Sequence, residues 1–91
     1  MQQEWTDEEL FDAVSAYVDM LKKQKYNLKF VKSNYYKYLS IKHNRTPNSF
    51  KRRMHNISYV FSLMGEDNID GLVPACNIGK KNFQKSNLLH L

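Results

Sequence analysis

The sequence predicts an all-α domain of three helices. Apolar side chains recur at three- and four-residue steps in three separate segments, which is the spacing of one helical face. The 91 residues include only 3 Gly and 2 Pro, too few for a turn-rich β-sandwich. A chain of this length forms one domain at most. We expect a helical bundle over residues 1–65. Residues 66–91 should be an extended or weakly helical extension that partly packs on the bundle or links it to a missing domain.

The first helix is expected over residues 7–23. Thr6 and Glu9 have the spacing of a capping box, in which each side chain bonds the backbone N–H of the other residue. Acidic residues fill the first turn, where they suit the positive end of the helix dipole. Trp5 precedes the cap and should pack back on the first turn. Its apolar face consists of Leu10, Phe11, Val14, Tyr17, Val18 and Leu21, of which Leu10, Val14 and Val18 are expected in the core.

A short second helix is expected over residues 34–42, with Ser33 as its N-cap. The connector before it, residues 24–32, lacks helical periodicity, and three apolar residues should pin it to the core: Leu28, Phe30 and Val31. The predicted core side of the helix consists of Tyr35, Tyr38 and Leu39. Tyr36 is expected to face elsewhere, and its role stays open.

The third helix has the clearest limits, over residues 47–64. Thr46 supplies a capping hydroxyl, and Pro47 suits the first helical position because its missing N–H would have no partner there. Gly65 is a natural C-terminal cap. Its apolar stripe, spaced four, three and four residues apart, is formed by Phe50, Met54, Ile57 and Phe61.

The charge distribution favours a polyanionic partner. Residues 1–19 contain six acids and no Lys or Arg, whereas residues 20–64 contain eleven bases and no acid. Such a long stretch without a carboxylate repels itself unless an anion or the acidic first segment offsets it. Nucleic acid is the commonest partner for this pattern, although a solvated basic surface without a partner is the alternative. A membrane surface fits less well, because the bases do not oppose one broad apolar face.

The outer face of the third helix is the predicted reader of double-stranded DNA. A step of 100° per residue, with Phe50 in the core, points Arg52, His55 and Tyr59 away from the core. Arg52 and His55 should lie deepest in the major groove, and Asn48 can bond an adenine edge. The other candidates should hold phosphates or flank the groove. The full set of candidates is Arg45, Thr46, Asn48, Ser49, Lys51, Arg52, Arg53, His55, Asn56 and Tyr59.

Two stretches carry a family resemblance. Glu4-Trp5-Thr6-Asp7-Glu8-Glu9-Leu10 resembles the opening of a Myb/SANT-type three-helix domain, and Arg45-Thr46-Pro47-Asn48-Ser49 resembles the start of its recognition helix. The run from Arg45 to Gly79, including Gly71-Leu72-Val73-Pro74-Ala75-Cys76-Asn77, is similar to the N-terminal domain found ahead of HNH nuclease modules in bacterial restriction-type endonucleases. The resemblance implies a helix-turn-helix module that targets a larger nuclease to duplex DNA.

The sequence offers no active site, and we expect no enzymatic activity, metal, cofactor or small-molecule substrate. His43, His55 and His90 are scattered, and each is expected at the surface or on a phosphate rather than as a metal ligand. Cys76 lies beside neither a His nor a second Cys. No apolar run approaches the length of a membrane span, and the polar start of the chain does not resemble a signal peptide. The expected location is therefore the cytoplasm.

Two further functions remain open at this point. SANT-like domains also bind proteins, so the basic segment is compatible with an interaction module for an acidic partner. The size of the chain is also compatible with a small stand-alone transcriptional regulator.

Overall fold

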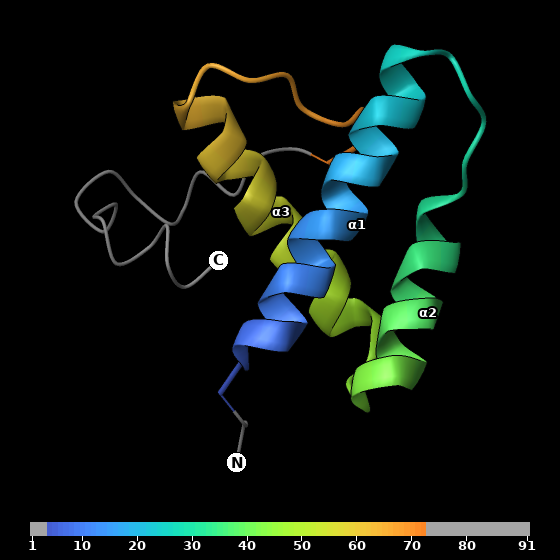
Figure 1. Ribbon diagram of the computed structural model, residues 1–91, viewed down its shortest axis with the longest axis vertical. Helices are drawn as coiled ribbons and strands as arrows, with labels where there is room; N and C mark the ends of the chain where they lie inside the picture. Colours follow the sequence, from blue (N-terminus) through green and yellow to red (C-terminus); the bar gives the residue numbers. More distant parts are fainter. Residues whose placement is uncertain (1–3, 73–91) are drawn as a thin grey trace.

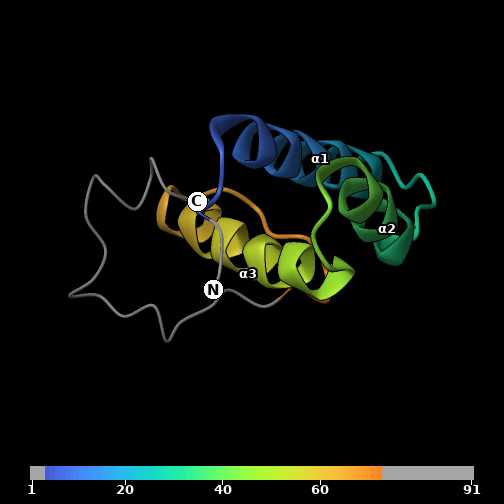
Figure 2. The same cartoon turned by 90° about the horizontal axis from the view of Figure 1, so that it is seen from below.

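The computed structural model describes residues 4–72, which form three α-helices and contain no β-strand (Figure 1). These are α1 (Asp7–Lys25), α2 (Lys32–His43) and α3 (Pro47–Leu63). Helices α1 and α2 run antiparallel, and α3 packs across both of them, as the view in Figure 2 shows. The all-α, three-helix prediction is therefore confirmed. The expected extended stretch from residue 73 and the weak helix near the end of the chain lie outside the described residues.

Capping interactions fix the ends of α1 and α3 as predicted. The Glu9 N–H donates to the Thr6 hydroxyl at 3.1 Å, and the Thr6 N–H donates to Glu9 Oε1 at 2.8 Å, which completes the capping box. The Thr46 hydroxyl accepts from the Ser49 N–H at 3.2 Å. Gly65, with φ of 80°, follows α3 in the left-handed conformation that glycine adopts without strain.

Helix α2 begins earlier than expected and without a side-chain cap. Its N-cap is Val31, which makes no capping hydrogen bond, so the prediction of Ser33 as N-cap is wrong. Because α2 forms without this local signal, we infer that tertiary packing holds its start in place. Asn44, with φ of 55°, ends the helix in the left-handed conformation.

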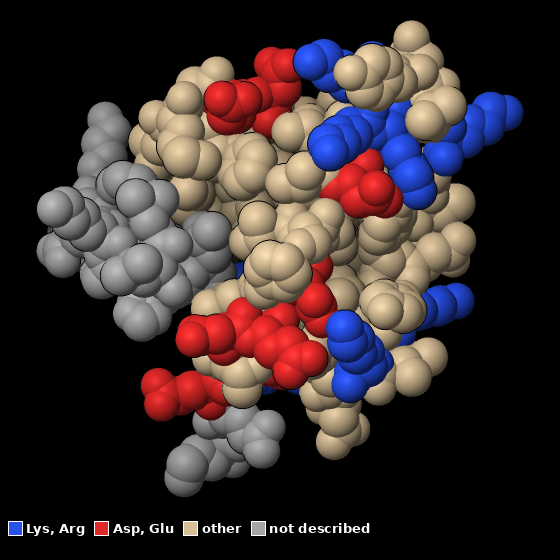
Figure 3. Space-filling model, in the orientation of Figure 1, with Lys and Arg blue, Asp and Glu red and all other residues tan. Residues whose placement is uncertain are grey.

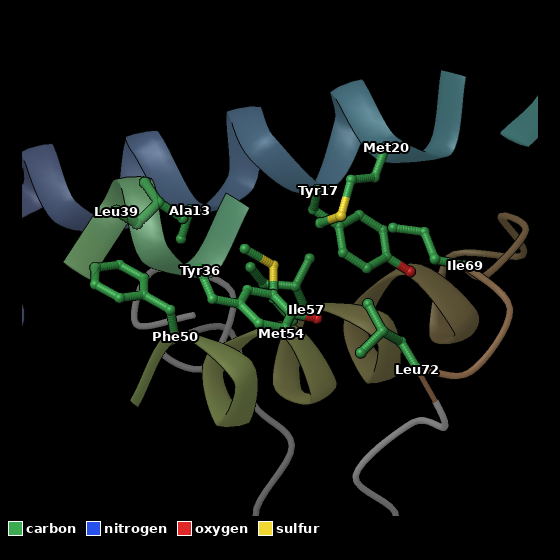
Figure 4. Close-up of a cluster of buried hydrophobic side chains, with 10 residues drawn as sticks. All are labelled: Ala13, Tyr17, Met20, Tyr36, Leu39, Phe50, Met54, Ile57, Ile69 and Leu72. Atoms are coloured by element: carbon green, nitrogen blue, oxygen red, sulfur yellow. The ribbon is translucent and has the colours of Figure 1, made fainter. Parts of the chain in front are cut away.

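The core lies between the three helices and includes the segment after α3. Four of the residues predicted for it from the sequence, Leu39, Phe50, Met54 and Ile57, are fully buried, which confirms their assignment. Ile69 and Leu72 are also buried, so the chain beyond Gly65 packs on the bundle at least up to Leu72. Figure 4 shows the ten side chains of this cluster: Ala13, Tyr17, Met20, Tyr36, Leu39, Phe50, Met54, Ile57, Ile69 and Leu72.

The buried face of α1 differs from the predicted one by about one residue position. Ala13, Tyr17 and Met20 are fully buried, whereas the residues predicted for the core lie at its flank and are only half-buried: Leu10, Val14 and Val18. Phe61 of α3 is also half-buried. Phe11 of the predicted apolar face is 71% exposed. Tyr17 belongs to the same predicted face but was not assigned to the core, and its side chain carries a polar hydroxyl. In the fold that hydroxyl has a buried partner in Ser58, 2.9 Å away, so Tyr17 can lie at the centre.

The tyrosines of α2 are arranged differently from the prediction. Tyr36 is buried, whereas Tyr38, which was assigned to the core, is 63% exposed. Tyr35 is half-buried at the edge, where its hydroxyl donates to Asp19 at 2.5 Å and accepts from Lys23 at 2.6 Å. These two contacts join α2 to the C-terminal half of α1.

The connector between α1 and α2 is held by one residue rather than three. Leu28 and Val31 are more than half exposed, so the prediction that they pin the connector to the core is wrong. Phe30 does pack against the core, with its ring beside that of Tyr35. The amide side chain of Gln24 also bonds the backbone of Asn68 and Asp70, which ties the end of α1 to the segment after α3.

An ion pair between Glu9 and Arg45 joins the beginning of α1 to the beginning of α3. Arg45 Nε donates to Glu9 Oε2 at 2.6 Å, and Arg45 Nη2 donates to Glu9 Oε1 at 3.1 Å. The two side chains are only 13% and 8% exposed. The hydrogen bond from Arg45, together with the bonds from Thr6, lowers the pKa of Glu9 from 4.5 to about 2 despite its burial.

The low pKa of Glu9 predicts a specific loss of stability in acid. Since the folded-state pKa lies below the unfolded-state value, Glu9 contributes its full stabilisation above about pH 4.5 and loses it as the pH falls towards 2. The loss should be about 3 kcal/mol. Urea unfolding between pH 6 and pH 2 should show it in the wild type and in the control Glu8→Gln, but not in Glu9→Gln. A parallel decline in all three would contradict the assignment.

The central position of Met54 predicts a large effect of its truncation. Met54 is fully buried, so Met54→Ala should lower the free energy of unfolding by about 2–5 kcal/mol. Ile41 is 84% exposed, so Ile41→Ala should change it by about 0.5 kcal/mol or less. Denaturant titration of both variants measures the difference. Equal effects would contradict the described core.

Candidate nucleic-acid interface

The N-terminal half of α3 presents polar and basic side chains to solvent. Asn48, Lys51 and Arg52 are exposed, and their spacing of three and four residues places them on one face of the helix. Thr46 is exposed at the N-cap, where its hydroxyl lies 2.9 Å from that of Ser49. The structure thus brings together four of the ten predicted residues as a continuous exposed surface: Thr46, Asn48, Lys51 and Arg52.

The predicted surface does not continue along the whole helix. His55 and Asn56 are half-buried, and Tyr59, predicted to point away from the core, is only 8% exposed. Four consecutive residues, from Ile57 to Val60, are buried, so α3 is covered around most of its circumference at this height. The helical projection assumed a single buried face, which holds only for the first half of α3. The prediction for Tyr59 is therefore corrected.

Arg45 lies beside the exposed surface and also holds two segments of the fold together. Its guanidinium bonds both carboxylate oxygens of Glu9 and, through Nη2, the carbonyl oxygen of Glu4 at 2.9 Å. The sequence predicted a phosphate contact here, because the ion pair with a residue 36 positions away has no local signal. The signal that the sequence does offer is Glu9 itself, because an acidic residue fixed in a capping box is available as a partner for an arginine.

Arg45 and Arg53 both pack against the ring of Trp5. Each guanidinium carbon lies 4.3 Å from the centre of the ring, a distance typical of cation–π contacts. The Trp5 ring in turn meets Phe50 edge-on, at 5.0 Å between ring centres. Burial and the nearby charge of Arg45 lower the pKa of Arg53 from its ordinary value. The sequence predicts that Trp5 packs on the first turn of α1, and it carries no sign of the contacts with these arginines.

A small pocket opens beside these stacked groups. Its volume is about 280 Å³, and it lies between the segment before α1 and the first half of α3. Arg52, which is exposed on the predicted DNA-binding face, also lines this pocket. The pocket is lined by Trp5, Arg45, Ser49, Arg52, Arg53 and Asn56.

The acidic residues of α1 contact specific bases on α1 itself and on α2. Asp12 lies 2.8 Å from both Lys42 Nζ and His43 Nε2, and Asp19 lies 3.3 Å from Lys23 Nζ. The hydrogen bond from Lys42, followed by that from His43, lowers the pKa of Asp12. His43 was expected at the surface or on a phosphate, but its side chain is only 8% exposed and bonds Asp12.

Bases that have no ion pair in the described part of the chain remain at the surface. They include Lys51 and Arg52 of α3 and several lysines near the connector. Figure 3 shows Lys and Arg gathered over the end of α1 and the connector, with acidic side chains over the beginning of α1. Two separate basic surfaces therefore exist, one on α3 and one around residues 22–32.

Comparison with known proteins identifies no relative. No family model, no curated protein and no solved structure matches the chain. Within residues 4–72, no helix is long and apolar enough to cross a membrane, and no cluster of three or more His, Cys, Asp and Glu side chains has the geometry to hold a metal ion. Cys76 and His90 lie outside the described residues.

Proposed function

We propose that this chain binds double-stranded DNA through the first half of α3. The observation that carries the proposal is the exposed face formed by Asn48, Lys51 and Arg52, which contains no acid and begins at a well-capped helix N-terminus. Lysine and arginine can hold phosphates, the asparagine amide can bond a base edge, and the N-terminal N–H groups favour an anion. We assign the described residues a binding role and no catalytic one.

The larger role that we propose is the targeting of a nuclease. It rests on the sequence similarity of residues 45–79 to the domain that precedes HNH modules in bacterial restriction-type endonucleases. In that setting the protein would act in the bacterial cytoplasm, where DNA is its partner, and a nuclease domain would lie elsewhere in the same protein. The short exposed stretch of α3 fits a module that binds DNA while another domain of the same protein catalyses the cleavage.

One observation favours the alternative of a protein-interaction module. Tyr38 and Ile41 of α2 are 63% and 84% exposed and lie three residues apart, so they share a face of the helix. Exposed apolar side chains next to lysines suit a partner that is acidic and partly apolar. Binding to DNA and binding to such a partner differ in their dependence on salt and on the surface used.

Salt dependence separates DNA binding from this alternative. If α3 holds phosphates, the logarithm of the affinity for duplex DNA should fall by about 0.9 per phosphate contacted for each tenfold rise in salt. We expect a slope of about −2 or steeper from the exposed bases. Fluorescence anisotropy with a labelled random-sequence duplex at several salt concentrations measures this slope. Absence of binding at low salt would refute the proposal.

Substitutions on α3 should distinguish residues that contact phosphates, and so position the DNA, from residues that contact bases, and so recognise its sequence. Lys51→Ala should weaken binding equally on all duplexes and reduce the salt slope by about one unit, because it removes one phosphate contact. Asn48→Ala should cost about 1–3 kcal/mol on a preferred site and little on a scrambled one. Ile41→Ala on α2 is the matched control and should leave DNA binding unchanged. A loss of DNA binding in the Ile41 variant alone would place the DNA-binding surface on α2 and contradict its assignment to α3.

A further inference from the structure

The two ends of α1 carry exposed side chains of opposite charge. Glu4, Asp7 and Glu8 are exposed at its beginning, and none of their carboxylates forms an ion pair within residues 4–72. Lys25 and Lys29, at its end and in the connector, are also exposed without an ion pair in the same residues. Figure 3 shows the acids over the beginning of α1 and the bases over its end.

Exposed apolar side chains accompany the charges at both ends. Phe11 follows Glu8 by three residues and Asp7 by four, so the three share a face of α1. We call Glu4, Asp7, Glu8 and Phe11 the acidic surface. The connector surface combines two lysines with three apolar side chains that are more than half exposed: Lys25, Tyr26, Leu28, Lys29 and Val31. Apolar side chains exposed among charged ones are typical of contact surfaces.

The acidic surface and the connector surface are too far apart to meet within one molecule. Helix α1 has 19 residues and is therefore about 28 Å long. Charges attract only weakly over such a distance, because physiological salt screens them within about 8 Å.

The connector surface also has acidic neighbours. Glu66 and Asp67 line a pocket together with Lys25, and Asp70 lines another together with Lys29. The lysines alone therefore do not define the partner of this surface. Its partner must fit the apolar side chains as well as the positive charges.

The acidic surface of a second copy of the chain meets both requirements. It presents carboxylates on the same face as one exposed aromatic ring, that of Phe11. An open pocket of about 780 Å³, lined in part by Leu28, Lys29 and Val31, offers space for such a ring beside the connector.

We propose that copies of this chain associate head to tail, with the acidic surface of one copy against the connector surface of the next. In this contact Phe11 enters the connector pocket, and the carboxylates of Asp7 and Glu8 face Lys25 and Lys29. A two-fold contact between identical surfaces would instead place like charges opposite each other, which is unfavourable. Each copy keeps one surface of each kind free, so association can continue beyond the dimer. The inference goes beyond DNA binding and does not depend on it.

Sedimentation velocity of the full chain without DNA tests the association. The average sedimentation coefficient should rise with protein concentration at low salt. It should fall to the value of the monomer at about 1 M salt, where charges are screened beyond about 3 Å. A chain that remains monomeric at low salt over the whole concentration range would refute the proposal, whether or not the chain binds DNA.

Charge reversal tests which surfaces are in contact. Lys29→Glu and Glu8→Lys should each weaken the association about tenfold or more, because each places like charges opposite each other. Phe11→Ser should also weaken it, since the apolar contact is lost. Lys37→Glu is the matched control: Lys37 is exposed on α2, outside both surfaces, and its reversal changes the net charge as Lys29→Glu does. Circular dichroism checks that each variant is folded.

A mixture of the two reversed variants separates the proposed contact from a general effect of charge. Glu8→Lys retains an intact connector surface and Lys29→Glu an intact acidic surface, so an equimolar mixture should associate where each variant alone does not. Three results would overturn the proposal: association unchanged in Lys29→Glu, an equal loss in the control Lys37→Glu, or no recovery in the mixture. DNA binding can be present or absent in every case, so the two proposals are tested independently.

Discussion

The contact between Glu9 and Arg45 is the constraint on which the arrangement of α1 and α3 depends. Glu9 closes the capping box of α1 and at the same time bonds the guanidinium that precedes α3. The N-termini of the two helices are therefore fixed to each other through one carboxylate. A nearly buried ion pair stabilises only when its geometry is good and its remaining polar atoms are satisfied. Here both carboxylate oxygens accept hydrogen bonds, from Thr6 and from Arg45.

This use of acidic residues explains how the chain tolerates a long segment without carboxylates. The first helix supplies Glu9, Asp12 and Asp19, and each of them contacts a base in the following 45 residues or within its own helix. The acidic N-terminal segment thus acts as an internal counter-charge rather than as a separate acidic tail. The bases that it does not reach, such as Lys51 and Arg52, keep the positive charge of the middle segment at the surface.

The parts of the fold that were predictable from sequence are those with local causes. The capping residues Thr6 and Thr46 and the glycine after α3 act within a few residues, and the sequence places these helix ends to within two residues. The start of α2 has no such signal, and its prediction was wrong. The core side of α1 was predicted about one residue position away from the buried one, because distant contacts, such as that of Tyr17 with Ser58 41 residues away, decide which edge of the apolar face is buried. A hydroxyl pair of this kind leaves no pattern in a single sequence.

The same distinction applies to the candidate site. A helical projection identifies Asn48, Lys51 and Arg52, because exposure in the first half of α3 follows from its apolar stripe alone. It fails for Tyr59, where the helix is covered on more than one side. The helical projection also does not distinguish Arg45 and Arg53 from the exposed bases. In the fold, Trp5 packs against both arginines, and Glu9 forms an ion pair with Arg45. Arg45 and Arg53 thus belong to the packed cluster around Trp5 and Glu9, and we expect a change at Trp5 or Glu9 to alter how these arginines are held without removing a basic group.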